Sequence, residues 1–201
     1  AAALALPRPL ALRRKLEAFH GKQDAQAITK AWPNLGHDDR FIRYAARIAV
    51  EHQPVDQWRS KALSETDPQT LITAMVALAR QGKESDLGDA LASLNRLDLT
   101  KLPEQQLLEA LRAYQLAFIR LGKPNNAQRA QVAHKIDAIY PHDSQDANRE
   151  LCNLLVYLDA PSVIEKTLKL MANLPPEEQP EWATVLSRNR GYGGAAQAML
   201  D

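Results

Sequence analysis

One pattern of apolar residues occurs four times along this chain and constrains its fold more than any other feature. The copies begin at Phe41, Leu71, Leu107 and Leu151. Each copy is apolar at i, i+1, i+3, i+4 and i+7 and polar at i+2, which is the pattern of a helix with a buried stripe and a narrow solvated edge. Phe41 and Tyr44, at positions i and i+3 of the first copy, are therefore expected to be buried.

Prolines and capping residues mark where the other helices begin and end. All twelve prolines fall at an expected helix boundary or in a linker, and no β-branched run suits a strand, so the sequence predicts an all-α protein. Expected caps are Asp24, Asp38 or Asp39, Asp67 before Pro68, and Asn125 or Asn126. The expected hairpins pair residues 10–19 with 24–32, 39–50 with 56–65, 68–80 with 85–97, 103–121 with 125–139, and 147–159 with 162–171.

The spacing of the four copies indicates the type of repeat. The copies begin 30, 36 and 44 residues apart, whereas tetratricopeptide and ankyrin repeats keep periods of about 34 and 33 residues. An irregular spacing favours a HEAT-like α-α superhelix, because such a solenoid tolerates helices and loops of different lengths. Each hairpin must stack on neighbours to bury its stripe, so we expect a right-handed solenoid of about five to six hairpins. We expect one domain over 1–201, with a linker at 1–9, five hairpins at 10–174 and a partial sixth unit at 175–201.

Composition limits the classes of function. The net charge of +1 creates no general attraction for nucleic acid or membranes, and no apolar run is long enough to span a bilayer. The only cysteine, Cys152, cannot form an internal disulfide. The chain lacks an initiator Met, which favours a piece of a longer protein over the remnant of a processed signal peptide. Residues 195–201 are expected to begin a helix whose neighbour lies beyond the chain, so its end could self-associate weakly.

Three arginines fall on one face of the helix expected at 39–50. Arg40, Arg43 and Arg47 are spaced i, i+3 and i+7, which would suit a stripe that contacts phosphates or carboxylates. The favoured interpretation is a solvated face with an Asp39–Arg43 pair, because the first helices of the hairpins should form the convex side.

The sequence contains no recognisable catalytic, metal or cofactor motif. None of the five histidines has a His or Cys partner three or four residues away, and His37 and His142 are interpreted as turn residues beside an aspartate. Cys152 lies on an apolar stripe and is interpreted as a small buried hydrophobe. Gly191-Tyr192-Gly193-Gly194 follows a helix, so a hinge or turn is favoured over a phosphate-binding loop. We therefore predict no catalytic residue, no metal site and no cofactor.

An interaction surface is expected on the second helices of the hairpins. Its candidate residues are Arg59, Arg96, Lys135, Lys166 and Lys169, and Tyr192 in the glycine-rich loop is a further possible contact. The same helices also carry Asp56, Asp86, Asp89, Asp137 and Glu165, so their charge is mixed.

Several segments resemble HEAT-like domains of large bacterial multidomain proteins associated with c-type cytochromes. The resemblance rests on Leu16 to Gly21, Asp39 to Ala46, Arg149 to Leu158 and Arg190 to Gly194. In that family the helical region lies beside a haem-binding module and often a propeller-like dehydrogenase module. The C-x-x-C-H haem attachment is missing from this sequence, so no catalytic residue is carried over. The resemblance implies an exported, periplasmic or cell-envelope parent in which this segment is a spacer or docking surface.

Two functions from different classes follow. The first is a non-catalytic α-solenoid scaffold that docks a protein partner or neighbouring domains of its parent chain, without membrane insertion. The alternative is a HEAT-like nucleic-acid-binding protein of the DNA glycosylase type, whose phosphate contacts would come from Lys30, Lys61 and the cations of the expected surface. The interspersed carboxylates favour the first function.

Overall fold

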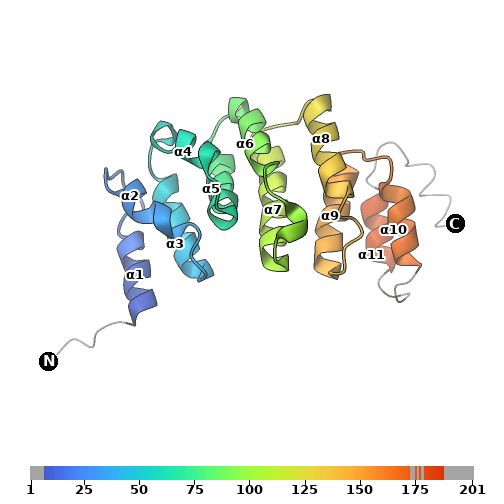
Figure 1. Ribbon diagram of the computed structural model, residues 1–201, viewed down its shortest axis with the longest axis horizontal. Helices are drawn as coiled ribbons and strands as arrows, with labels where there is room; N and C mark the ends of the chain where they lie inside the picture. Colours follow the sequence, from blue (N-terminus) through green and yellow to red (C-terminus); the bar gives the residue numbers. More distant parts are fainter. Residues whose placement is uncertain (1–6, 173–174, 176, 178, 188–201) are drawn as a thin grey trace. The chain divides into compact units, whose positions relative to one another are not determined.

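The protein is all-α, as the sequence predicts. The computed structural model describes residues 7–172, 175, 177 and 179–187. Within these residues the chain forms eleven α-helices and four short 3-10 helices, and it forms no strand (Figure 1). None of the described helices is both long enough and apolar enough to cross a membrane. Tyr192 and the helix expected at 195–201 lie outside the described residues.

The helices follow the expected order along the chain. Their bounds are α1 (Arg8–Glu17), α2 (Ala27–Ala31), η1 (Trp32–Asn34), α3 (Arg40–Glu51), η2 (Val55–Gln57), α4 (Arg59–Ser64), α5 (Pro68–Gln81), η3 (Glu84–Asp86), α6 (Leu87–Leu94), η4 (Leu99–Lys101), α7 (Glu104–Arg120), α8 (Asn126–Asp137), α9 (Gln145–Tyr157), α10 (Val163–Met171) and α11 (Gln179–Leu186). Several of the second helices are shorter than expected, because a 3-10 turn forms part of the segment.

Short polar side chains fix the first turns of the longer helices. Asp39 accepts a hydrogen bond from the Phe41 N–H at 2.8 Å, and Asp67 accepts one from the Thr70 N–H at 2.8 Å. These contacts satisfy N–H groups that lack a partner within the helix. The expected caps at Asp39 and Asp67 are thereby confirmed. Asn125 is the cap of α8, where it forms a reciprocal capping box with the residue three positions later.

The expected cap at Asp24 is wrong in position. Helix α2 begins at Ala27, and its N-cap residue is Gln26. Asp24 instead accepts a hydrogen bond from the Gln26 N–H at 2.9 Å and closes a turn before the helix. An aspartate side chain can stabilise either a turn or a helix start, and here the local turn is preferred over an earlier helix start.

The described residues group into two compact units. Unit 1 contains residues 7–97 and 116–123, and unit 2 contains residues 98–115 together with the described residues from 124 onward. Helix α7 is shared between the two units.

Unit 1 stacks the first helices of three successive hairpins. Helix α1 packs against α3, and α3 packs against α5 (Figure 1). The shorter helices form further contacts, because α2 lies against α3, α4 against α5 and α6, and α5 against α6. Leu71, Met75 and Leu78 on α5 are buried as the second copy of the stripe predicts. Burial of each such side chain contributes about 1.5–3 kcal/mol to folding.

Unit 2 is organised around α9. Helix α9 contacts α8, α10 and α11, and α10 also contacts α11. The fourth copy of the stripe is confirmed on this helix, where Leu151, Cys152 and Leu155 are buried and Asn153 is exposed. The predicted solvated edge at position i+2 of the pattern therefore faces solvent here.

The first copy of the stripe is oriented differently from the prediction. Phe41 is 52% exposed and Tyr44 is 58% exposed, although both were expected in the core. The buried stripe of α3 consists of Ile42, Ala45 and Ala49, with their neighbours Ala46 and Val50. A helix turns about 100° per residue, so the two aromatic side chains lie more than roughly 100° from the centre of this stripe.

The reason for this difference is the width of the apolar arc. The apolar residues of α3 span a wider arc of the helix surface than the arc that is buried against α1, α2 and α5. The alanine-rich part faces inward because small side chains let neighbouring helices approach closely and pack densely. Phe41 and Tyr44 are left on the adjoining face, where arginine side chains contact their rings.

Candidate functional site

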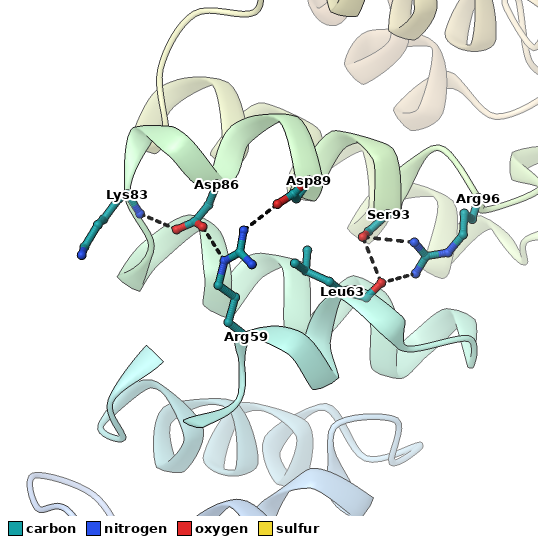
Figure 2. Close-up of polar contacts among 7 residues, drawn as sticks. All are labelled: Arg59, Leu63, Lys83, Asp86, Asp89, Ser93 and Arg96. Atoms are coloured by element: carbon teal, nitrogen blue, oxygen red, sulfur yellow. Dashed lines mark hydrogen bonds and ion pairs between the residues drawn. The ribbon is translucent and has the colours of Figure 1, made fainter. Parts of the chain in front are cut away.

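Arg59 begins α4 and bridges it to the start of α6. Its Nε donates a hydrogen bond to Asp86 Oδ1 at 2.6 Å, and its Nη2 donates one to Asp89 Oδ2 at 2.6 Å. Figure 2 shows the guanidinium between these two carboxylates. The hydrogen bonds to Asp86 and then to Asp89 raise the pKa of Arg59 above its ordinary value. The residue therefore stays charged while it joins two helices of unit 1.

Asp86 is the buried member of this cluster. Its second oxygen, Oδ2, accepts a hydrogen bond from the Lys83 N–H at 2.8 Å, which caps the short helix η3. Burial raises the pKa of the carboxyl group, but the Lys83 N–H and the Arg59 guanidinium outweigh it, so the pKa of Asp86 is lowered. One carboxylate thus serves as both a helix cap and the partner of a cation from the neighbouring helix.

Arg96 binds the opposite end of α4. Its Nη2 donates a hydrogen bond to Leu63 O at 2.7 Å, and its Nη1 donates one to Ser93 Oγ at 3.2 Å (Figure 2). The same Nη2 also donates to Glu65 O at 2.9 Å. The final carbonyl groups of a helix lack N–H partners within the helix, and a cation at this end also interacts favourably with the helix dipole. Arg96 therefore stabilises the C-terminal end of α4.

The two lysines of α10 are also engaged within unit 2. Lys166 Nζ lies 2.7 Å from Asp137 O and 2.9 Å from Asp137 Oδ1, so it joins α10 to the end of α8. Lys169 Nζ donates to Glu165 Oε1 at 2.6 Å, one turn earlier on the same exposed face. The first contact links two elements, whereas the second is a local pair of the kind that contributes little to stability.

The two remaining candidates of the expected surface differ in how they are placed. Lys135 is partly buried on α8, and this burial lowers the pKa of its ammonium group. Tyr192 lies outside the described residues. The structure brings Arg59 and Arg96 to one pair of helices, α4 and α6, and Lys166 and Lys169 to one helix, α10. Their role as an interaction surface stays a prediction.

The loop histidines take part in turns, as expected. His37 Nδ1 accepts a hydrogen bond from the Asp39 N–H at 2.9 Å, and His142 Nδ1 accepts one from the Ser144 N–H at 3.0 Å. In both cases the acceptor nitrogen lies two residues before the N–H, directly ahead of a helix. Among the described residues, no group of three or more His, Cys, Asp or Glu side chains could hold a metal ion.

Cys152 is buried in a small polar cluster of unit 2. Its Sγ lies 3.6 Å from Thr167 Oγ1, and that hydroxyl lies 2.7 Å from Tyr140 Oη. Burial raises the pKa of the Cys152 thiol, which disfavours the thiolate form that acts as a nucleophile. The structure thus gives the cysteine a packing role consistent with its place on the stripe.

The sequence pattern places Arg40 and Arg47 on one face of α3, but the exposed aromatic rings beside them were not predicted. Phe41 lies beneath two guanidinium groups, with the Arg40 Cζ 4.8 Å and the Arg13 Cζ 5.8 Å from its ring centroid. The Arg47 Cζ lies 5.1 Å from the centroid of the Tyr44 ring. We refer to these five residues as the arginine–aromatic patch. The available signal was the alanine stripe of α3, which marks the buried face and leaves both aromatics outside it.

Comparison with known proteins does not place this chain in a family. No family model, no curated protein and no solved structure matches it.

Proposed function

We propose that this chain is a non-catalytic, HEAT-like α-solenoid that docks other proteins or neighbouring domains. The observation that supports it is the packing of unit 1, where the first helices α1, α3 and α5 of successive hairpins stack side by side and α4 packs on α6. Stacked helical hairpins create extended surfaces that are suited to binding other proteins.

Several charged side chains join neighbouring helices, which also supports a structural role for them. Arg59 and Arg96 bind acceptors on the neighbouring helix, and Lys166 binds the end of α8. These contacts hold consecutive helices together, as a repeat array requires. Cys152, the only thiol, is buried and has a raised pKa. We therefore infer that such a chain acts by binding partners at its surface.

The nature of the parent protein is part of this proposal. The segments that resemble HEAT-like domains of cytochrome-associated bacterial proteins support a larger, exported redox-type protein, with this chain as a spacer or docking module. In that setting the domain is periplasmic or attached to the cell envelope, and its partners are neighbouring modules or a separate protein.

Size-exclusion chromatography with light scattering tests the docking function. The purified chain is mixed with the other polypeptide modules encoded by its gene and with cell-envelope proteins, and any complex is identified by mass spectrometry. We expect a stoichiometric complex. The Ala49→Asp variant should lose it, because a charge at this buried position of α3 disrupts helix stacking. Lys101→Ser, a change at an exposed position, is the matched control.

One experimental result would contradict the docking proposal. If the chain forms no complex and instead converts small molecules, with activity that Ala49→Asp abolishes, then it is an enzyme and the proposal is wrong.

A further inference from the structure

Positive charge is concentrated on two packed helices of unit 1. Helices α1 and α3 together carry seven arginine or lysine residues and two glutamates, whereas the whole chain has a net charge of only +1. One of these glutamates, Glu51, is 8% exposed and is covered by Arg47 and Arg80. The other, Glu17, pairs with Arg13 at 2.6 Å. The surface of these helices therefore presents mainly cationic groups.

The arginine–aromatic patch lies within this cationic region. Phe41 and Tyr44 are more than half exposed, and each ring has at least one guanidinium above it. Arg40 is exposed, and within the described part of the chain its guanidinium group has no hydrogen-bond or ion-pair partner. Exposed aromatic and arginine side chains are the residue types that contribute most to binding at protein interfaces.

The stacking geometry indicates which ligand chemistry fits. A guanidinium that stacks on a ring keeps its in-plane N–H donors available, and these donors match a carboxylate in a bidentate arrangement. The Phe41 ring already has two guanidinium groups within 6 Å, at Arg13 and Arg40. Carboxylates can bind the exposed edges of these guanidinium groups while their contact with the ring is kept.

We propose that the arginine–aromatic patch binds an acidic peptide segment that also carries bulky apolar side chains. Its carboxylates pair with Arg13 and Arg40, and its apolar side chains cover Phe41 and Tyr44. Arg47 is held by Glu51 and keeps the Tyr44 ring in place. This inference rests on the proposed docking function and places the docking surface on the first helices of the hairpins.

Peptide selection on the full chain tests this inference. Random dodecapeptides displayed on phage are selected on the immobilised protein, and the enriched peptides are measured by fluorescence anisotropy. We expect enrichment of peptides with several Asp or Glu residues and at least one aromatic or large aliphatic residue. The Phe41→Ala/Tyr44→Ala double variant should weaken their binding at least about tenfold, as for central interface residues. Arg40→Glu should weaken binding by a similar factor and reduce its dependence on salt.

Matched variants separate the patch from general effects. Lys30→Glu makes the same charge reversal on α2, outside the patch, and Tyr157→Ala removes an exposed tyrosine from α9. Both should leave peptide affinity within about twofold, and circular dichroism should show that every variant is folded.

Three results would overturn this inference. The first is enrichment of neutral or basic peptides, and the second is enrichment of peptides whose affinity is unchanged in the patch variants. The third is binding of single-stranded oligonucleotides, lost in the patch variants, with no peptide enriched. A stoichiometric protein complex that survives the patch variants would leave the docking function standing and reject only this surface. The absence of both peptides and complexes would reject the two together.

Discussion

At the scale of residues, arginines of this chain have two distinct uses. Arg59, at the start of α4, donates to carboxylates at the start of α6, and Arg96, after α6, donates to carbonyl groups at the end of α4. Arg13 and Arg40 lie over an exposed aromatic ring, and Arg40 has an exposed guanidinium group. The difference arises from helix termini, because unpaired backbone groups and capping carboxylates provide internal acceptors that a helix surface lacks.

The Asp86 carboxylate, held by the Lys83 N–H and by Arg59, should make stability depend on pH in the acidic range. The pKa of Asp86 in the folded protein is below its ordinary value of 3.8, so its ionised form favours folding. This contribution is complete above the unfolded pKa and is lost as the pH falls through the folded pKa. We expect Asp86→Asn to lower the free energy of unfolding by about 1 kcal/mol at neutral pH, because Asn keeps an acceptor for the Lys83 N–H but loses the charge.

Urea unfolding of wild type and Asp86→Asn, followed by circular dichroism at several pH values, measures this effect. The difference between the two proteins should shrink as the pH is lowered below about 4. Asp89→Asn is the control, since Asp89 is much more exposed in the same cluster and its loss should cost only a few tenths of a kcal/mol. A difference that stays constant down to about pH 2 would contradict the assignment.

At the scale of elements, three segments of unit 2 meet at one buried hydroxyl. Thr167 on α10 is fully buried and donates to Val163 O at 2.6 Å. Its single proton is then used, so the 2.7 Å contact with Tyr140 has the tyrosine hydroxyl as donor. Cys152 on α9 approaches the same oxygen. The hydroxyl therefore couples the end of the α8 segment to α9 and α10.

The Thr167→Val variant should show how much the hydrogen bond between Tyr140 and Thr167 contributes to the free energy of unfolding. The change keeps the side-chain shape but leaves the Tyr140 hydroxyl buried without its acceptor, so we expect a loss of about 1–3 kcal/mol in the free energy of unfolding. Adding Tyr140→Phe should recover part of the loss, because the unpaired hydroxyl is then removed. Urea unfolding of the two single variants and the double variant gives the coupling energy. Strictly additive losses would show that the two hydroxyls do not interact.

At the scale of the whole molecule, the near-balance of charge conceals a local imbalance. The chain has 25 Lys and Arg residues and 24 Asp and Glu residues, but α1 and α3 carry a clear excess of cations. Several cations elsewhere pair with carboxylates, such as Lys166 with Asp137. The positive electrostatic potential is therefore concentrated near α1 and α3. Such a distribution suits a partner that covers a limited area.

This charge distribution predicts weak binding to duplex DNA. A protein that neutralises six phosphates loses affinity with a slope of about −5 in a plot of log affinity against log salt concentration. We expect no such slope for this chain, and no binding tighter than the typical non-specific range at physiological salt. Anisotropy of a labelled random-sequence duplex over a range of salt concentrations measures both quantities. A steep slope with tight binding would favour the DNA glycosylase-type alternative over docking.

The sequence by itself determined the helices and where most of them begin. Asp39, Asp67 and Asn125 cap their helices as expected, because capping depends on neighbouring backbone groups within the same few residues. The stripe of α9 was also predictable, since its apolar residues are nearly all buried between α8, α10 and α11. Periodicity and capping are local properties, so they can be inferred without knowledge of the neighbours.

Only the tertiary structure decided which part of a wide apolar arc is buried and which cations remain available. On α3 the alanine stripe is buried, and Phe41 and Tyr44 are left exposed beside arginines. The acceptors that join Arg59 and Arg96 to another helix segment lie 27 to 33 residues away in the chain, so no local pattern indicates them. Burial and ion pairing depend on the neighbours that a helix acquires in the fold, and those neighbours follow from packing between distant segments.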